Sequence, residues 1–383
     1  MYNSPYLTEA HEELRMKVRR FAEQEIKPVA AKLDEGEIFS EKLTARMGEM
    51  GFFGIQAPVE LGGQGLDTLS YIIIVEELAR VDSSQAATVA AVNSLGIAPI
   101  LKYGTEEQKK KYIPPLCTGK MIWAFGLTEE NAGSDAMGSE TTARLENNQW
   151  IINGSKTHIT NSSTPNSGGV TLQAVTGEKN GRKKLSTIIV EKGTPGFTTE
   201  KITGKMMWRA SDTGRLYFKD CRVPAENLLG EVGQGGRIML NTLDSGRLSI
   251  GAIGLGLAVG AMEASLEHAR ERQQFGQSIS KFQAVGFKLA DMDIKIELAR
   301  NTLYNACWRK DNNLQFAREA AISKLYTSEI AREIADEAVQ IHGAKGLFKP
   351  HPIERFYRDQ RLLQIGEGTS EILRLVISRY LGT

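Results

Sequence analysis

The sequence is poor in cysteine and carries no excess of charge. Its 383 residues include three widely spaced cysteines, Cys117, Cys221 and Cys307. A disulfide framework or a CxxC metal clip needs paired cysteines at short spacing, so neither is expected. The 47 Lys and Arg residues balance 46 Asp and Glu residues. Because so small a net charge creates no field that gathers nucleic acid or an anionic membrane, neither partner is predicted.

Long apolar runs and targeting segments are also scarce. The longest uncharged apolar stretch, residues 83–101, is interrupted by Gln85, Asn93, Ser94 and Pro99. These interruptions favour a buried core helix over a membrane span. The first residues resemble neither an apolar signal segment nor an arginine-rich transit peptide, so a cytoplasmic location is expected.

The usual catalytic motifs are missing as well. The sequence has no GK[ST] phosphate loop and no G-x-S-x-G serine, and its five histidines form no HxxxH pair, so no metal site is predicted. Gly254, Gly256 and Gly260 look like a dinucleotide fingerprint, but they lie inside a helical pattern and the third glycine is one residue late. We interpret them as small residues that permit close helix packing.

Hydrophobic periodicity divides the chain into three parts. Apolar residues recur at helical spacing up to about residue 120, shift toward a period of two up to about residue 230, and return to helical spacing near 237–273, 281–311, 316–342 and 351–381. The middle part reads as a small antiparallel sheet or barrel, and the last as an antiparallel helix bundle. The expected fold is α+β, with domains at residues 1–120, 121–232 and 233–383.

Five segments carry polar residues suited to a cofactor or substrate: residues 124–135, 153–161, 269–283, 340–346 and 357–372. The first two follow apolar strand-like runs and offer hydroxyl and backbone hydrogen bonds to a polar heterocycle, although each is equally a turn. Arg272 beside an aromatic residue suits a diphosphate and a flat base, although a solvated helix end is the plainer interpretation. The fourth segment reads equally as a helix C-cap.

Glu367 is the candidate base. It stands between Gly366 and Gly368, directly before a helix whose cap is Thr369 or Ser370. A lone glutamate is usually a surface residue, but two flanking glycines clear space for a carboxylate to approach a ligand closely. A carboxylate desolvated there would bind protons more tightly than usual.

In this order and spacing, the five segments resemble the acyl-CoA dehydrogenase family of flavoenzymes over essentially the whole chain. The resemblance implies an N-terminal helical domain, a central β-barrel and a C-terminal four-helix bundle, with FAD between them. It also implies a homotetramer and an electron-transferring flavoprotein as redox partner. The implied reaction is removal of the α-proton of an acyl-CoA by Glu367 with transfer of the β-hydride to the flavin, giving a trans-2-enoyl-CoA.

The resemblance also assigns individual residues. The implied FAD contacts are Phe125, Leu127, Thr128, Ser134, His158, Ile159, Thr160, Arg272, Phe275, Gln283, Gln340, Gly343, Ala344, Thr369, Ser370 and Glu371, of which Arg272 to Ala344 are contributed across a dimer. The implied substrate contacts are Ala91, Leu95, Ser134, Asp244, Arg247, Gly366 and Gly368. Some family members carry the base at the position of Gly246, which here cannot titrate.

Three positions depart from the family pattern. His158 replaces a usual Trp or Phe beside the flavin, and Ala344 replaces a usual glycine, which would weaken FAD binding if its backbone requires a positive φ. Gly366 replaces a Tyr frequent in straight-chain medium-chain members. The lost aromatic widens the site, so we predict a short, branched or cyclic acyl group. An acyl-CoA oxidase or monooxygenase of the same fold, and a catalytically silent flavoprotein, remain the competing interpretations.

Overall fold

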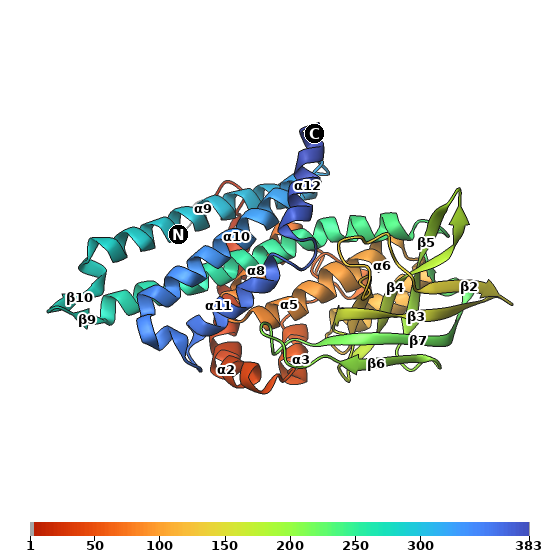
Figure 1. Ribbon diagram of the computed structural model, residues 1–383, viewed down its shortest axis with the longest axis horizontal. Coiled ribbons are helices and arrows are strands. Elements are labelled where there is room, and N and C mark those ends of the chain that lie inside the picture. Colours follow the sequence, from red (N-terminus) through yellow and green to blue (C-terminus); the bar gives the residue numbers. More distant parts are fainter. Residues whose placement is uncertain (1–3, 383) are drawn as a thin grey trace.

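The computed structural model describes residues 4–382 and arranges helices, sheet and helices in sequence order (Figure 1). The order confirms the predicted α+β fold. The first part begins its helices at side-chain caps such as Thr8, Asp67 and Thr105, each of which accepts a backbone hydrogen bond. Its helices are α1 (Glu9–Phe21), α2 (Lys27–Gly36), α3 (Glu41–Glu49), α4 (Thr68–Ala79), α5 (Ser83–Ala91), α6 (Ala98–Tyr103) and α7 (Glu106–Cys117), with π-helical turns η1 (Ala22–Ile26) and η3 (Val92–Ile97) and the 3-10 turn η2 (Val59–Leu61).

The middle part is an eight-stranded sheet in the order β6-β7-β3-β2-β4-β5-β8, with β1 paired parallel to β4. Its strands are β1 (Ile122–Gly126), β2 (Thr142–Glu146), β3 (Gln149–Thr160), β4 (Ser167–Lys179), β5 (Arg182–Glu191), β6 (Phe197–Lys201), β7 (Thr213–Pro224) and β8 (Leu228–Leu229). Buried and exposed residues alternate along much of β7, so one face of that strand packs on the core. Ile152, Val170 and Leu216 lie in this core.

The last part contains α8 (Gly235–Glu271), α9 (Gln283–Asp311), α10 (Ala317–His342), α11 (Pro352–Leu363) and α12 (Ser370–Tyr380), with a short hairpin of β9 (Gln273–Gln274) and β10 (Gln277–Ser278) after α8. The prediction of one helical segment over residues 351–381 was wrong. Helix α11 ends at Leu363, and one continuous helix cannot span the loop up to Ser370 because Glu367 and Gly368 have φ values of 52° and 100°. No α-helix accommodates such left-handed backbone.

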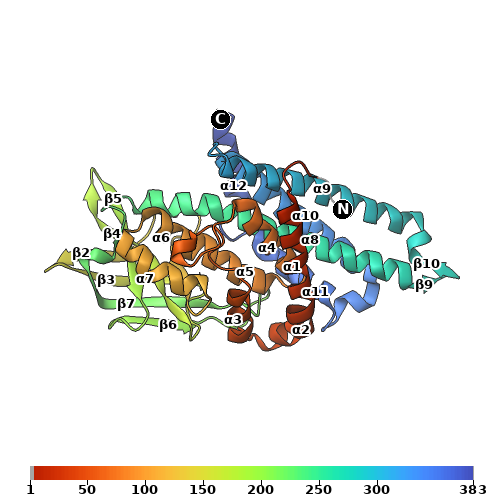
Figure 2. The same cartoon turned by 180° about the vertical axis from the view of Figure 1, so that it is seen from behind.

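Helix α8 runs from the sheet to the far end of the bundle (Figures 1 and 2). Two helical stretches, Ser83–Tyr103 and Gly235–Glu271, are long and apolar enough to cross a membrane, yet 83% and 78% of their most apolar windows are buried inside the protein. Internal packing therefore accounts for their apolar residues.

The glycines of α8 let it approach α4. A Cβ atom added at Gly256 would lie 2.1 Å from the Glu76 carbonyl oxygen, and one at Gly260 would lie 2.1 Å from the Arg80 carbonyl oxygen. Both contacts are far shorter than any real Cβ contact, and both partners are rigid backbone. The interpretation of this glycine run as a helix-packing device is confirmed.

We predict that Gly256→Ala lowers the free energy of unfolding by about 1–3 kcal/mol, because the methyl group forces α8 away from α4. Gly286→Ala in α9 is the matched control, since nothing lies within 4 Å of a Cβ atom there. That control should stabilise the protein by up to about 1 kcal/mol through helix propensity. Urea unfolding of both variants measures the difference, and equal effects would contradict the packing role.

Candidate active site

Two of the segments implied to contact a flavin lie side by side. Residues 127–141, here called the β1 loop, follow β1, and residues 157–161, the β3 turn, close β3. The Thr157 N–H donates to the Thr128 carbonyl oxygen at 3.0 Å and ties the loop to the turn. Phe125 is buried at the end of β1, whereas Leu127 and Thr128 are half-buried. Residues far apart in sequence therefore meet where β1 and β3 end.

A buried lysine holds the β1 loop, and sequence reasoning missed it. The Lys156 ammonium group donates to Glu129 Oε1 at 2.7 Å, to Ser139 Oγ at 2.9 Å and to the Leu127 carbonyl oxygen at 3.1 Å. Burial opposes ionisation of Glu129, but Lys156 and several hydrogen bonds outweigh it and lower the pKa of Glu129 to about 2. The pair is therefore charged at neutral pH and fixes the loop from inside.

The β3 turn presents unsatisfied hydrogen-bonding groups. Thr157 Oγ1 and both polar side-chain atoms of Asn161 are buried without a partner in the described part of the chain. Buried polar groups normally find partners, so these fit a polar heterocycle. Between them His158 is exposed with a left-handed φ of 58°, Ile159 is buried and Thr160 is half-buried. These donors and this acceptor suit a polar heterocycle such as the flavin that the resemblance implies.

The carboxylate of Glu367 lies against the backbone of α8. It projects from the α11–α12 loop (residues 364–369), and a Cβ atom added at Gly246 would lie 2.1 Å from Glu367 Oε2. The residue is partly exposed, yet Oε2 itself is buried and has no hydrogen-bond partner within residues 4–382. The space that a side chain at position 246 would fill is thus occupied by the carboxylate.

Two cationic side chains flank this carboxylate. Arg247, on α8, is buried and pairs with Asp244 at 2.5 Å, and Lys324, on α10, donates to the Gly368 carbonyl oxygen at 2.6 Å. Burial raises the pKa of Glu367 to about 7, while Lys324 and Arg247 act in the opposite direction. A carboxylate that titrates near neutrality is well matched to general-base catalysis.

Helices of the N-terminal part of the protein place small and hydroxylated side chains near the Glu367 carboxylate. The Tyr71 hydroxyl donates to the Ala90 carbonyl oxygen at 2.9 Å, and Ser94 Oγ donates to the same oxygen at 2.8 Å. Leu95, in the π-helical turn η3, lies within 4 Å of a Cβ atom at Gly246. Ala91 is buried on the adjoining helix α5. Of the implied substrate residues, Leu95, Asp244, Arg247, Gly366 and Gly368 therefore gather around Glu367.

Sequence reasoning missed Lys324 and Tyr71, although the spacing of apolar and small residues around Lys324 could have indicated that it is buried. Ala320, Thr327 and Ala331, which lie four residues before, three after and seven after Lys324, are all fully buried. This spacing places Lys324 on the buried face of its helix. Tyr71 lies in a helix buried on all sides, where periodicity carries no information.

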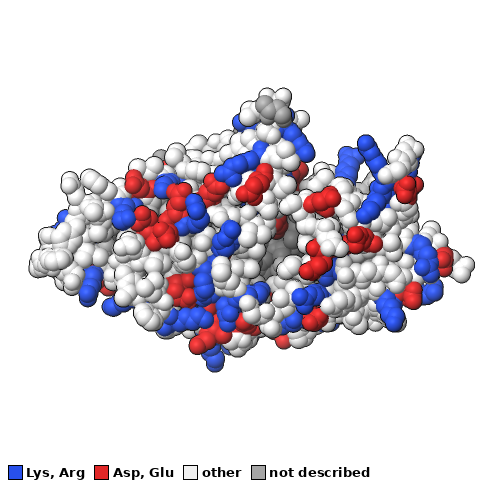
Figure 3. Space-filling model, viewed as in Figure 1, with Lys and Arg blue, Asp and Glu red and all other residues white. Residues whose placement is uncertain are grey.

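Figure 3 shows a face with interspersed acidic and basic side chains, hollowed where the helical and β parts meet beside α12. Thr369 caps α12 by accepting from the Ile372 N–H at 3.2 Å. A cavity of about 400 Å³ is lined by Thr369, Ser370 and Glu371 together with Glu329, Arg332, Arg361, Gln364, Ile365 and Arg374. Ser134 is exposed on the β1 loop.

The remaining implied FAD residues lie elsewhere. Arg272, Phe275 and Gln283 are exposed at and beside the β9–β10 hairpin, at the opposite end of the molecule from the sheet (Figures 1 and 2). Gln340, Gly343 and Ala344 are exposed at the end of α10, where the rings of His342 and His268 stack with centroids 4.5 Å apart. A single chain does not bring these residues to the β1 loop.

The expectation of strain at Ala344 does not hold. Gly343 takes the positive φ of 60°, whereas Ala344 is not among the residues with positive φ. Alanine is therefore tolerated at position 344, and weaker FAD binding is not expected from it.

Comparison with known proteins settles the family. The chain matches the family models described as acyl-CoA dehydrogenase N-terminal domain at residues 8–120, middle domain at 124–221 and C-terminal domain at 233–382. It belongs to the acyl-CoA dehydrogenase family. It is therefore an oxidoreductase.

Three relatives are informative about this family member. A short-chain specific acyl-CoA dehydrogenase of Clostridium acetobutylicum is 44% identical over 376 residues, or 97% of this chain and 98% of the relative. A chain from a structural study of the electron-transferring flavoprotein of Acidaminococcus fermentans is 44% identical, with a TM-score of 0.96 and 99% of both chains covered. An acyl-CoA dehydrogenase of Bacillus anthracis complexed with FAD is 35% identical, with a TM-score of 0.92 and 99% of this chain and 68% of that one covered.

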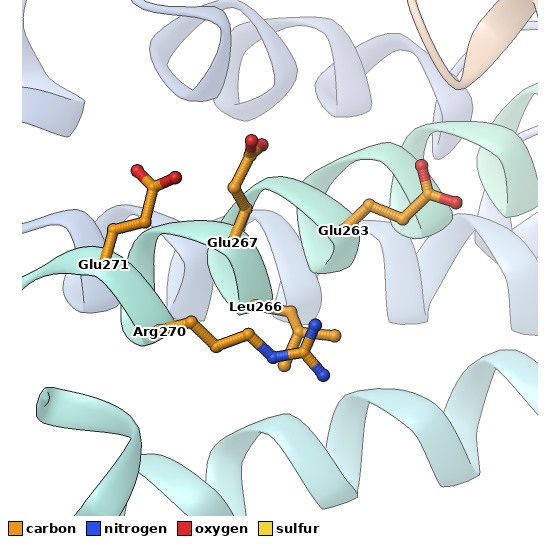
Figure 4. A pocket seen from close by; sticks show the side chains of 5 residues that line it. All are labelled: Glu263, Leu266, Glu267, Arg270 and Glu271. Carbon is orange, nitrogen blue, oxygen red and sulfur yellow. The ribbon is translucent and has the colours of Figure 1, made fainter.

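A second cavity lies away from the site of this acyl-CoA dehydrogenase. It has a volume of about 220 Å³ and is lined by Glu263, Leu266, Glu267, Arg270 and Glu271. The three carboxylates point to one side of α8 and Arg270 to the other (Figure 4). Glu263 pairs with Arg80 at 2.7 Å. At 1.5 Å per residue the cavity begins about 25 Å along the helix from Gly246, so it takes no part in the chemistry at Glu367.

We predict that Glu129→Gln lowers the free energy of unfolding by about 3–5 kcal/mol at pH 7, because it leaves the Lys156 ammonium buried without a counter-charge. Glu130→Gln, an exposed neighbour, should change it by less than about 0.5 kcal/mol. Since the pKa of Glu129 is held near 2, its stabilising effect is present above the pKa of the unfolded chain and fades as pH falls toward 2. Chemical denaturation from pH 5 down to pH 2 should show the wild-type and Glu129→Gln free energies of unfolding converging, and a constant gap over this range would contradict the prediction.

Proposed function

We propose that this acyl-CoA dehydrogenase uses FAD to convert a short, branched or cyclic acyl-CoA to the trans-2-enoyl-CoA and passes the electrons to an electron-transferring flavoprotein. The observation that carries the proposal is the buried carboxylate of Glu367, set against Gly246 between two cationic side chains. The family membership and the relatives reported above support the cofactor and the partner.

FAD, when bound, supplies the acceptor for the substrate hydride. The chain would hold its ring system between the β1 loop and the β3 turn, where Thr157 and Asn161 offer unsatisfied polar atoms. The bond from the Thr157 N–H to the Thr128 carbonyl oxygen and the buried Lys156–Glu129 pair keep these elements in register. This rigidity supports a fixed distance between the ring and the substrate.

Glu367 would take the α-proton onto its carboxylate, with the carbon–hydrogen electron pair remaining on the substrate. It must be ionised to do so, and a pKa of about 7 leaves a useful fraction ionised at neutral pH while keeping the group basic. A positioned base contributes about 10²- to 10⁴-fold in rate. The backbone N–H of Glu367, implied by the family to donate to the thioester oxygen, would contribute roughly 3 kcal/mol more.

The walls of the site support a short or branched acyl group. The three atoms nearest to a Cβ atom at Gly366 would belong to Leu362, at 3.5–3.6 Å, which is ordinary van der Waals contact, so the backbone leaves room for a Cβ atom there. Ala90 and Ala91 are small and buried, and the hydroxyl groups of Tyr71 and Ser94 both donate to the Ala90 carbonyl oxygen. The relative from Clostridium acetobutylicum is named short-chain specific.

The geometry also supports an assembly of several copies. Arg272, Phe275 and Gln283 lie at the end of the bundle remote from the β1 loop. If they contact FAD as the family implies, they must contact the FAD held by another copy. A homotetramer satisfies this requirement.

The proposal is tested by anaerobic titration of the purified holoenzyme with butyryl-CoA and isobutyryl-CoA, followed by flavin absorbance. We expect the wild-type flavin to lose its colour and Glu367→Gln to do so at least 10²-fold more slowly while retaining FAD. Glu178→Gln, an exposed glutamate in β4 outside the β1 loop, should behave as the wild type. A protein without bound flavin, or a Glu367→Gln variant that reacts at the wild-type rate, would disprove the proposal, and rapid reoxidation by air would indicate an oxidase instead.

A second prediction concerns the acyl group. Gly366→Tyr adds an aromatic side chain of about 150–250 Å² beside the base and should lower the turnover of isobutyryl-CoA relative to butyryl-CoA. Gly366→Ala, whose Cβ atom makes only ordinary contacts, is the control for folding and for the loss of glycine itself. The ratio of kcat/KM values for the two substrates is the measurement. An unchanged ratio in Gly366→Tyr would show that position 366 does not select the acyl shape.

A further inference from the structure

The α11–α12 loop carries the base but has few side chains to hold it. Glu367 has a left-handed backbone conformation between two glycines, which offer no side chain for packing. Backbone bonds bracket the loop, since the Gly366 N–H donates to the Leu362 carbonyl oxygen at 2.8 Å and the Ser370 N–H to the Gln364 carbonyl oxygen at 3.1 Å. What fixes the peptide after Glu367 is a side chain from another helix.

That side chain is Lys324. It is fully buried on α10, and its ammonium group donates to the Gly368 carbonyl oxygen at 2.6 Å, across 44 residues of chain. Placing an ammonium group in a protein interior costs free energy unless its donors are satisfied. Here one donor is used on the residue that follows the base. A lysine in the middle of a buried helix face calls for an explanation other than surface solvation.

We propose that Lys324 is a positioning residue for the base, whose ammonium group anchors the α11–α12 loop through the Gly368 carbonyl oxygen and favours the ionised form of the Glu367 carboxylate. The inference rests on the proposed function, in which Glu367 removes the α-proton. It adds to that function a residue that acts through the base and its loop.

The other charged and titratable groups around Glu367 do not replace this effect. Arg247, on α8, shares its charge with Asp244 at 2.5 Å, whereas the bonded partner of Lys324 is a neutral carbonyl group. Tyr71 faces the carboxylate from α4, and burial raises its pKa so that it stays neutral near pH 7. Glu371, on α12, is exposed and adds negative charge. Of the two cations near Glu367, Lys324 is therefore the one not paired with a carboxylate of its own.

The pKa shifts of Lys324 and Glu367 agree with this geometry, because each group favours the charged form of the other. Burial lowers the pKa of Lys324 to about 8, and Glu367 is the foremost group opposing that shift. Lys324 is in turn the foremost group opposing the rise of the pKa of Glu367 to about 7. Removing the ammonium charge must therefore raise the pKa of Glu367 further. The base would stay protonated to higher pH.

The test is the pH dependence of kcat/KM for the holoenzyme with butyryl-CoA. We expect the acid limb of the wild type to have its midpoint near pH 7 and that of Lys324→Met to move upward by about one unit or more, so that the rate at pH 6.5 falls about tenfold or more beyond any loss at pH 9. Lys324→Gln, which keeps a donor without the charge, should move the midpoint while retaining more of the high-pH rate. It carries the test alone if Lys324→Met does not fold.

Lys205→Met is the matched control. Lys205 is a second lysine whose pKa burial lowers to about 8, and it donates to the Trp208 and Ser211 carbonyl oxygens away from the base. Its loss should lower thermal stability without moving the midpoint. If the midpoint stays at the wild-type value in both Lys324 variants while Glu367→Gln is inactive, Lys324 only packs the core and the inference fails, although the proposed function stands. If Glu367→Gln is active, the proposed function itself fails.

Discussion

The Glu367 carboxylate and the backbone of Gly246 share a space that holds only one side chain, and the position of the base depends on this contact. A Cβ atom at position 246 would lie 2.1 Å from Oε2. The carboxylate can lie there only because α8 has no side chain at that position and because the α11–α12 loop adopts left-handed backbone at Glu367. A non-glycine residue in that conformation costs about 1 kcal/mol or more, which the surrounding contacts must offset.

Both loops of the site are held in the same manner. Lys156 reaches the Leu127 carbonyl oxygen of the β1 loop, and Lys324 reaches the Gly368 carbonyl oxygen of the α11–α12 loop. In each case a buried ammonium group comes from a regular strand or helix and bonds to the backbone of an irregular segment. Buried charges contribute little to stability. A buried ammonium group nevertheless needs acceptors for its N–H groups, and this need restricts the backbone that supplies those acceptors to one geometry. Such costly groups are consistent with the precision that a reacting centre needs.

The sequence was sufficient for the order of the three parts and for the glycine packing of α8, because both depend on local spacing. It was also sufficient to single out Glu367, since two flanking glycines are a local feature. Apolar periodicity predicted one helical segment over residues 351–381, whereas the cap expected at Thr369 or Ser370 correctly indicated that a new helix begins after Glu367. The anchoring lysines were missed because their partners lie 27 and 44 residues away in sequence. Only the burial of the whole helix face around Lys324 could have indicated it.

The separation of the implied FAD residues has a physical consequence for the active unit. Phe275 is 93% exposed at the tip of the β9–β10 hairpin, and Leu347 and Phe348 are exposed beyond the end of α10. Exposed aromatic side chains on a hairpin tip add nothing to the stability of one copy. Covering them with a partner removes apolar surface from water and therefore stabilises the complex. On the proposed function, the end of one bundle covers the FAD that another copy holds at its β1 loop. Cofactor binding and assembly would then be linked, because each stabilises the surface that the other requires.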